Sequence, residues 1–313
     1  MGDPPKLSVQ LAPRHHRGLI LSNPVMIAAG IAGYGTEFDE IRDIQKLGAV
    51  VCKGTTLAPR EGNAQPRLVE TASGLLNSVG LENIGVDALI REKAPVWAGW
   101  RVPVIVNIAG ETTDEYAAVA GKLEGVPGIS GIEVNISCPN VSAGGMEFGV
   151  APKLAAAVTS AVKSATSLPV IVKLSPNVTD IEEIASAVEE AGADAISLIN
   201  TLKGMAIDID KKRPYLGNVV GGLSGPAIKP VALHMVFEVA RVTHVPLIGC
   251  GGITCGRDAL EFIMAGATAV QIGTAGLTSP DIYLTILEGI EHFMLDNGIE
   301  DVRELIGVAR HGS

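Results

Sequence analysis

The chain has 313 residues, which suits one large domain or two small ones, and 47% of them are hydrophobic, enough for a substantial core. Its formal net charge of −10 argues against an electrostatic grip on nucleic acid or anionic lipid, because both need a basic surface. The 37 glycines indicate many tight turns between short elements.

The N-terminal segment carries prolines and charges where a signal peptide needs an apolar stretch. No segment reaches the roughly 18 uninterrupted apolar residues of a membrane span. The four cysteines, Cys52, Cys138, Cys250 and Cys255, form no CxxC pair, so we expect no metal in this chain. Such scarce cysteines fit a reducing compartment, and we expect a cytoplasmic protein without a membrane or nucleic-acid partner.

Short β-branched runs recur along the chain, each bounded by glycine or proline, and amphipathic segments lie between them. The predicted strands are residues 25–29, 49–53, 102–109, 132–137, 169–175, 195–200, 245–252 and 269–274. Predicted helices include residues 113–125, 151–166, 180–193 and 226–243. This alternation predicts an α/β protein, most simply a (β/α)8 TIM barrel, with a doubly wound parallel sheet as the alternative.

Two features favour the barrel. Polar residues or glycines follow the apolar runs, namely Lys53, Asn107, Asn135, Lys173, Asn200, Gly251 and Gly273. In a barrel these positions meet at the C-terminal mouth, where barrel enzymes keep their chemistry. In addition, no G-x-G-x-x-G follows the first strand, as a Rossmann unit would require.

Two segments, residues 54–84 and 203–224, are too long for ordinary strand-to-helix loops. We predict that they fold over the mouth as inserted lids or hairpins. No repeat or linker divides the sequence, and we therefore expect a single domain over residues 1–313.

The last two predicted strands each end in small residues just before a helix, an arrangement in which backbone N–H groups can cradle a phosphate. Barrels often use the loops after the seventh and eighth strands for this purpose. The phosphate candidates are Gly225, Gly251, Gly252, Gly273 and Thr274. Any one of these glycines could equally serve a tight turn, but together they favour a phosphate-bearing ligand.

Lysines and asparagines make up the rest of the predicted mouth. Lys53 and Lys173 each close an apolar strand, where an ammonium either forms a structural ion pair or stabilises negative charge on a cofactor or substrate. Five asparagines lie in loops or near strand ends, namely Asn77, Asn107, Asn135, Asn140 and Asn200. Carboxamides offer a donor and an acceptor together, so a ring of them suits a planar ligand such as a pyrimidine, although any single one could cap a turn.

Cys138 lies beyond a strand end, next to Pro139 and before a glycine-rich tail over residues 142–145 that could act as a hinge. Cys52 and Cys250 sit inside apolar runs and are expected to pack as small hydrophobes, while Cys255 stays undecided. A thiolate at position 138 could be a nucleophile or a general base. No histidine is placed as its partner, which favours the role of base.

Taken together, several motifs of the sequence resemble the dihydroorotate dehydrogenase family. The motifs that carry the resemblance are NISCPNV with AGGMEFG, CKGTTLAPREGNAQPR with NSVGLEN, VKLSPNVTD, GMAIDID with GGLSGPAIKP, and GCGGI with IGTA. They appear in family order between about residue 7 and about residue 306. The resemblance implies a (β/α)8 barrel that binds FMN and oxidises dihydroorotate to orotate in pyrimidine biosynthesis.

Residue roles follow from the resemblance. A base removes the C5 proton while a hydride passes from C6 to flavin N5, and class 1 members use a cysteine, here Cys138, as that base. The implied substrate residues are Lys53, Asn77, Ser78, Val79, Gly80, Leu81, Asn135, Asn140, Asn200 and Thr201. The implied flavin residues are Ala29, Lys53, Gly54, Thr55, Asn107, Asn135, Lys173 and Ile199, with Gly225, Gly251, Gly252, Gly273 and Thr274 around the phosphate. Lys173 would face the N1–C2 edge of the flavin, and Ala29 replaces a serine common in the family, so only a backbone contact is expected there.

The motifs look like the 1B type, whose catalytic subunit forms a homodimer core and pairs with an FAD and [2Fe-2S] subunit, giving a heterotetramer that reduces NAD⁺. The alternatives are a 1A enzyme linked to fumarate, a related flavin-dependent pyrimidine reductase, and a non-catalytic barrel that only binds a flavin or sugar phosphate. The quinone-linked membrane class is disfavoured because the N-terminus has no apolar extension.

Overall fold

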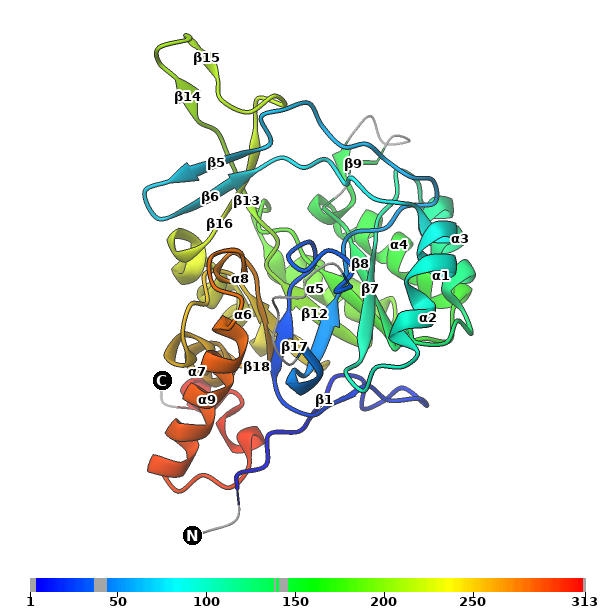
Figure 1. Ribbon diagram of the computed structural model, residues 1–313. Helices are drawn as coiled ribbons and strands as arrows, with labels where there is room; N and C mark the ends of the chain where they lie inside the picture. Colours follow the sequence, from blue (N-terminus) through cyan, green and yellow to red (C-terminus); the bar gives the residue numbers. More distant parts are fainter. Residues whose placement is uncertain (1–3, 37–43, 138, 141–145, 312–313) are drawn as a thin grey trace.

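The computed structural model describes residues 4–36, 44–137, 139–140 and 146–311. Its centre is a closed barrel of parallel strands in the order β11-β12-β17-β18-β3-β4-β7-β8 (Figure 1). These strands are β3 (Val25–Ile27), β4 (Ala49–Val51), β7 (Val104–Ile108), β8 (Gly131–Asn135), β11 (Val170–Lys173), β12 (Ala195–Leu198), β17 (Leu247–Cys250) and β18 (Ala267–Ile272). The (β/α)8 barrel is confirmed, and the doubly wound alternative is wrong because the sheet closes on itself.

Each of the eight predicted runs forms one barrel strand. Seven strands are shorter than predicted, whereas β18 has the predicted length but begins and ends two residues earlier. The run over residues 49–53, for example, leaves the sheet after Val51, and the run over 195–200 leaves it after Leu198. Lys53 and Asn200 therefore lie in the loops just beyond their strands, whereas Asn107 lies within β7. Apolarity marks the buried part of a strand and its loop alike, so it cannot tell where ladder hydrogen bonding stops.

Helices surround the barrel (Figure 1). They are α1 (Val86–Glu92), α2 (Ala94–Trp97), α3 (Thr113–Leu123), α4 (Pro152–Ala165), α5 (Ile181–Glu190), α6 (Lys229–Val242), α7 (Gly256–Ala265), α8 (Ala275–Thr278) and α9 (Ile282–Asp296). In α5 the buried residues Ile181, Ile184, Ala185 and Val188 follow helical spacing and pack on the core, and Asp180 Oδ1 caps the first turn by accepting from the Glu182 N–H at 2.9 Å.

The predicted helix over residues 226–243 begins later than expected. Residues Pro226–Ile228 form a 3₁₀ turn, and α6 starts only at Lys229. Further 3₁₀ turns are Ile44–Lys46, Phe148–Val150, Val302–Leu305 and Val308–His311. The segment after Gly225 is thus a tight turn that feeds a helix, which matters for the phosphate candidates.

The two long segments form one sheet across the mouth. Residues 54–84 supply β5 (Leu68–Thr71) and β6 (Gly74–Asn77), and residues 203–224 with Leu202 supply β13 (Leu202–Gly204) and β16 (Gly221–Ser224). The antiparallel order is β13-β16-β6-β5, so the hairpins predicted separately are joined through β16 and β6. Figure 1 shows this sheet beyond one end of the barrel, with the hairpin β14 (Ile207–Asp208) and β15 (Arg213–Pro214) projecting from it.

Two smaller antiparallel pairs complete the described strands. They are β1 (Val9–Gln10) with β2 (Ile20–Leu21), and β9 (Pro139–Asn140) with β10 (Met146–Glu147). Within the described ranges, no helix is both long and apolar enough to span a bilayer.

Candidate active site

An amide cluster lies at the carboxyl ends of β8 and β12, the two strands that flank β11 in the barrel. Asn200 donates from Nδ2 to Asn135 Oδ1 at 3.1 Å and to Ser137 Oγ at 3.0 Å. The Ser137 N–H donates to the same Asn135 oxygen at 3.2 Å, and the Thr201 N–H donates to Asn200 Oδ1 at 2.8 Å. The structure therefore brings Asn135 next to Asn200 and Thr201, although Asn135 and Asn200 are 65 residues apart in the sequence.

The sheet over the mouth brings Asn77 to this cluster. Asn77 is the register partner of Gly222 and donates from Nδ2 to the Gly222 carbonyl at 3.2 Å. A Cβ added to Gly222 would lie only 2.0 Å from Thr201 Oγ1, so Thr201 packs directly on that glycine. Asn77 and Thr201 thus contact the same residue of β16.

The loop after Asn77 is held by Asn63. The Asn63 Nδ2 donates to Ser78 Oγ at 3.0 Å, and the Asn63 N–H donates to the Val79 carbonyl at 2.9 Å. Gly80 has φ of 77°, and a Cβ there would lie 2.5 Å from the Asn63 side chain. The Ser78 hydroxyl therefore serves the loop itself, and the loop offers a ligand mainly its backbone.

Leu81 carries this loop to the start of the segment after β4. Its Cδ2 lies 3.2 Å from the Cβ position of Gly54, which is also 3.1 Å from Asn107 Oδ1. Buried Thr55 fixes this corner, since its N–H donates to the Asn107 carbonyl at 2.8 Å and its carbonyl accepts from the Ala109 N–H at 2.9 Å. Gly54, Thr55 and Asn107 form one corner of the mouth.

Lys53 is half-buried beside this corner, and its N–H donates to the Gly33 carbonyl at 2.7 Å. It borders an open cavity of about 500 Å³. The other lining residues are Tyr34, Arg60, Glu61, Glu82, Asn83 and Ile84. A half-buried ammonium at the edge of a cavity can meet an external carboxylate.

Lys173, in contrast, is buried inside the barrel. Its Nζ donates to Gln271 Oε1 at 3.0 Å and lies 3.8 Å from Glu133 Oε1. Burial disfavours the ammonium, but the Glu133 carboxylate outweighs that effect and raises the pKa of Lys173 above its ordinary value. Lys173 is therefore compatible with both roles considered from the sequence, since it forms a structural ion pair and lies within the predicted site, where it could stabilise negative charge on a ligand.

Glu133, Ser197 and Gln271 were missed by sequence reasoning. Glu133 is fully buried in β8 and accepts from Ser197 Oγ at 2.9 Å and from Gln271 Nε2 at 2.6 Å. The available signal was a polar residue inside an otherwise apolar strand, as in IEVNIS, AISLIN and AVQIG. Such a residue must find a partner inside the barrel.

The phosphate candidates surround one turn. Gly225 has φ of 93° and Gly252 has φ of 69°, and a Cβ on Gly252 would lie 2.8 Å from both the Gly225 carbonyl oxygen and the Lys229 N. The Cβ position of Gly225 lies 3.6 Å from Thr274 Cγ2, and Thr274 Oγ1 donates to Ser224 Oγ at 2.8 Å. Gly225, Gly252 and Thr274 therefore form a cradle of backbone and small side chains that no larger residue could line.

The remaining flavin candidates border this cradle. The Cβ position of Gly251 is 3.6 Å from Ile199 Cγ1, and the Ile199 N–H donates to the Cys250 carbonyl at 2.8 Å. The Cβ position of Gly273 is 3.9 Å from Ala28 Cβ, which places the loop of Ala29 next to Gly273. The predicted packing roles of Cys52 and Cys250 are confirmed, since both are buried, and Cys255 is exposed.

Cys138 and the predicted hinge residues 142–145 lie outside the described residues. Asn140 belongs to β9, which pairs with β10 through Asn140 and Met146, and its side chain lies outside the description. The predicted roles of Cys138 and Asn140 stay predictions.

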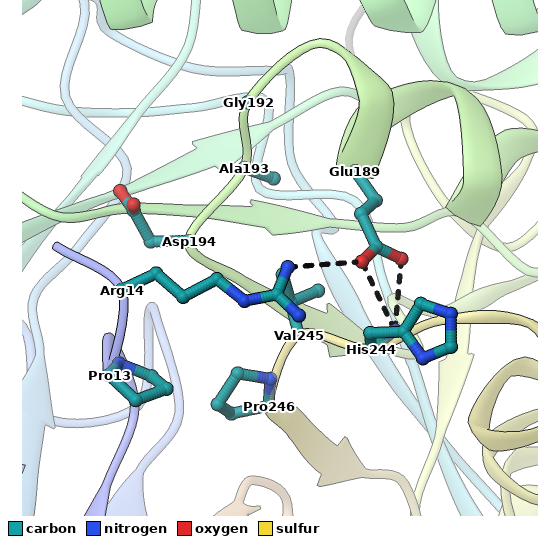
Figure 2. A pocket seen from close by; sticks show the side chains of 9 residues that line it. All are labelled: Pro13, Arg14, Glu189, Gly192, Ala193, Asp194, His244, Val245 and Pro246. Atoms are coloured by element: carbon teal, nitrogen blue, oxygen red, sulfur yellow. Dashed lines mark hydrogen bonds and ion pairs between the residues drawn. The ribbon is translucent and has the colours of Figure 1, made fainter.

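A second hollow lies at the opposite end of the barrel, before the starts of β12 and β17 (Figure 2). It is lined by Pro13, Arg14, Glu189, Gly192, Ala193, Asp194, His244, Val245 and Pro246. Glu189 accepts from the His244 backbone N–H at 3.0 Å and lies 3.9 Å from an Arg14 nitrogen. Among the predicted site residues that the structure describes, none lines this hollow.

Known proteins were compared with the chain. The family model described as dihydroorotate dehydrogenase matches residues 14–294. The chain belongs to the dihydroorotate dehydrogenase family. It is 55% identical over 303 residues to the "Dihydroorotate dehydrogenase B (NAD(+)), catalytic subunit" of Geotalea uraniireducens (strain Rf4), covering 97% of this chain and 98% of that protein. It is 56% identical over 291 residues to the protein of the same description from Desulforamulus reducens, covering 93% and 96%.

Dihydroorotate dehydrogenases are flavin-dependent oxidoreductases, and the described residues suit a flavin that carries a phosphate. The cradle of Gly225, Gly252 and Thr274 consists of backbone and small side chains, the kind of surroundings in which proteins hold phosphates. Lys173 is a buried ammonium, suited to the edge of a ring that becomes negative on reduction. Asn107 turns its Oδ1 toward Gly54 and offers an acceptor at the mouth.

Proposed function

We propose that this chain oxidises dihydroorotate to orotate, with FMN as cofactor, as the catalytic subunit of an NAD⁺-linked dihydroorotate dehydrogenase. The observation that carries the proposal is identity of 54–56% over 93–98% of the chain to proteins described as such catalytic subunits. The amide cluster of Asn135, Asn200 and Thr201 supports it, because the ring of dihydroorotate presents alternating C=O and N–H groups.

In this proposal the amide cluster and Asn77 bind and orient the substrate ring, and Lys53 binds its carboxylate. The loop over residues 78–81 closes the site from the side of Gly54, with Asn140 as a further substrate residue. The bond between the Lys53 ammonium and the substrate carboxylate would be charge-assisted, and such bonds are typically among the strong ones in a binding site.

FMN would be held by two groups of residues. Gly225, Gly251, Gly252, Gly273 and Thr274 would surround its phosphate, and the ring would lie among Ala29, Lys53, Gly54, Thr55, Asn107, Asn135, Lys173 and Ile199. A bound flavin supplies the acceptor for the two electrons and the hydrogen that leave C6. Lys173 would hold positive charge beside the ring.

Cys138 would remove the proton from C5. A thiol of ordinary pKa about 8.5 acts as a base only as its thiolate, so the rate of substrate oxidation should rise with pH until that group has titrated.

The relatives' name, "catalytic subunit", supports a further part of the proposal, a partner subunit that passes the electrons on. We expect that partner to carry FAD and a [2Fe-2S] cluster and to join a homodimer of this chain in a heterotetramer.

The proposal is tested with purified protein under anaerobic conditions. The protein should be yellow, and dihydroorotate should bleach its flavin absorbance. Cys138→Ser should keep the flavin and bleach far more slowly at neutral pH, because a hydroxyl is a much weaker base than a thiolate. A colourless protein that FMN cannot reconstitute would refute the function, and a variant as fast as the parent would move the base elsewhere.

A further inference from the structure

Glu133 is the centre of a buried polar cluster inside the barrel. Its carboxylate accepts from Asn107 Nδ2 at 2.8 Å, from Ser197 Oγ at 2.9 Å and from Gln271 Nε2 at 2.6 Å. The donors come from β7, β12 and β18, and Glu133 itself lies in β8 with no exposed surface. One carboxylate therefore ties together four strands of the barrel.

An ionised carboxylate only accepts hydrogen bonds, so it decides how its amide neighbours are turned. Asn107 must direct its NH₂ group at Glu133, which leaves its Oδ1 on the side of Gly54, 3.1 Å from that residue's Cβ position. Gln271 must likewise direct its NH₂ group at Glu133, and its Oε1 is then available to accept from Lys173 Nζ at 3.0 Å. The acceptor at the mouth and the bond to the buried lysine both follow from the charge at position 133.

The same carboxylate is the counter-charge of Lys173. The two side chains are 0% and 7% exposed, and their charged atoms are 3.8 Å apart. The other titratable group acting on this ammonium in the described part of the chain is Cys250 of β17, whose pKa burial raises, so that its thiol stays neutral. A buried ammonium without a counter-charge would lose its proton near neutral pH.

We propose that Glu133 is a positioning residue for the cofactor, which turns the Asn107 carbonyl toward the mouth and keeps Lys173 in place and charged beside the flavin ring. This inference rests on the proposed function, because it takes FMN as the ligand at this end of the barrel. Glu133 contacts Asn107 and Lys173, and it acts on the cofactor through these two side chains.

The test compares the FMN-loaded parent with Glu133→Gln. A glutamine cannot accept from all the donors and carries no charge, so the FMN dissociation constant should rise about tenfold or more. The absorbance of bound FMN should also show a new titration between about pH 6 and 9, as Lys173 loses its proton within that range. The double variant Glu133→Gln/Lys173→Met should lack the new titration, which identifies the lysine as its source.

Parent-like FMN affinity together with a parent-like titration in Glu133→Gln would overturn the inference. If that variant does not fold, Gln271→Met replaces it, since it has similar volume and removes the bridge between Glu133 and Lys173. Gln271→Met should weaken FMN binding by at least about threefold, and unchanged binding would overturn the inference as well. A parent protein that binds no FMN would instead refute the proposed function.

Discussion

Lys53 and Lys173 both follow apolar runs, yet their surroundings give them different tasks. Lys53 is half-buried and borders an open cavity, so its ammonium can meet a charge that arrives from solution. Lys173 is sealed inside the barrel with Glu133 and Gln271. Of these two lysines, Lys53 is placed to select a substrate by its carboxylate. Lys173 is placed to act on the flavin ring proposed to lie at the mouth of the barrel.

Lys53→Met should therefore weaken binding of orotate much more than binding of uracil. A hydrogen bond between charged groups typically contributes about 1.5–3 kcal/mol, which corresponds to roughly a tenfold to hundredfold change in the orotate dissociation constant. Uracil lacks the carboxylate, so its affinity should change little. Spectral titration of the flavin with each ligand measures both constants.

Lys203→Met is the matched control for this measurement. Lys203 lies in β13 at the same end of the barrel, is well exposed and pairs with Glu147 at 2.6 Å. Because the Lys203 side chain is 63% exposed, its ion pair contributes little, and orotate affinity should stay within about twofold of the parent. An orotate affinity unaffected by Lys53→Met would assign the carboxylate to another residue.

The hydrogen-bond and ion-pair partners of Glu133 could not be predicted from the sequence around it. A glutamate within IEVNIS indicates a polar position in a buried strand, but its four partners lie 26, 40, 64 and 138 residues away in sequence. No local pattern specifies such partners, because they meet only when the barrel closes. Asn135 and Asn200 were predictable because each follows an apolar run.

At the scale of elements, β-branched runs predicted all eight barrel strands, since a parallel sheet covered by helices buries both faces of each strand. The joint sheet of β13, β16, β6 and β5 was not predictable in the same way. Its central pairing joins Asn77 to Gly222, 145 residues apart, and the Thr201 side chain packs on that glycine. Hairpins are local, whereas the pairing of two hairpins is a tertiary contact.

The turn that forms the cradle is held by an ion pair between elements. Lys229, the first residue of α6, donates to Asp258 of α7 at 2.6 Å, and Asp258 also accepts from the Thr254 N–H and hydroxyl at 2.8 and 2.7 Å. Burial opposes the carboxylate charge, but these bonds outweigh it and lower the pKa of Asp258 to about 2.

Because the folded pKa is below the ordinary value, this pairing stabilises the fold above about pH 4 and is lost as the pH falls toward 2. Asp258→Asn should therefore lower the free energy of unfolding at pH 7 by roughly 2 kcal/mol, with a difference that shrinks over that acidic range. Urea unfolding across pH 2–7 measures it.

Glu261→Gln provides the comparison, because Glu261 contacts the same lysine at 3.0 Å but is 46% exposed. It should change the free energy of unfolding by less than about 0.5 kcal/mol. A difference for Asp258→Asn that persists undiminished at pH 2 would contradict the assignment to its charge.

At the scale of the whole molecule, cofactor binding should stabilise the entire barrel, because the proposed FMN residues come from strands all around it. FMN at about 100 times its Kd adds about 2.7 kcal/mol to the free energy of unfolding. For a protein of this size that shift raises the melting temperature by roughly 4 °C relative to the stripped protein, as calorimetry can measure.

A comparison of riboflavin with FMN distinguishes the contribution of the phosphate cradle to binding from that of the ring site. It lacks the phosphate, so at the same concentration it should stabilise the protein much less than FMN does. Equal stabilisation by riboflavin would show that Gly225, Gly252 and Thr274 hold no phosphate.

The barrel, the polar positions at its mouth and the family could all be predicted from the chain alone, because burial periodicity and short motifs are local properties. It also nominated Cys138, Lys53 and the asparagines from their places after apolar runs. The folded chain was needed to see which of these residues meet, how the two inserts pair, and that Glu133 contacts Asn107 and Lys173. Those contacts form only when closure of the barrel brings the strands together. They are specific because a buried charge that lacks its partners costs free energy.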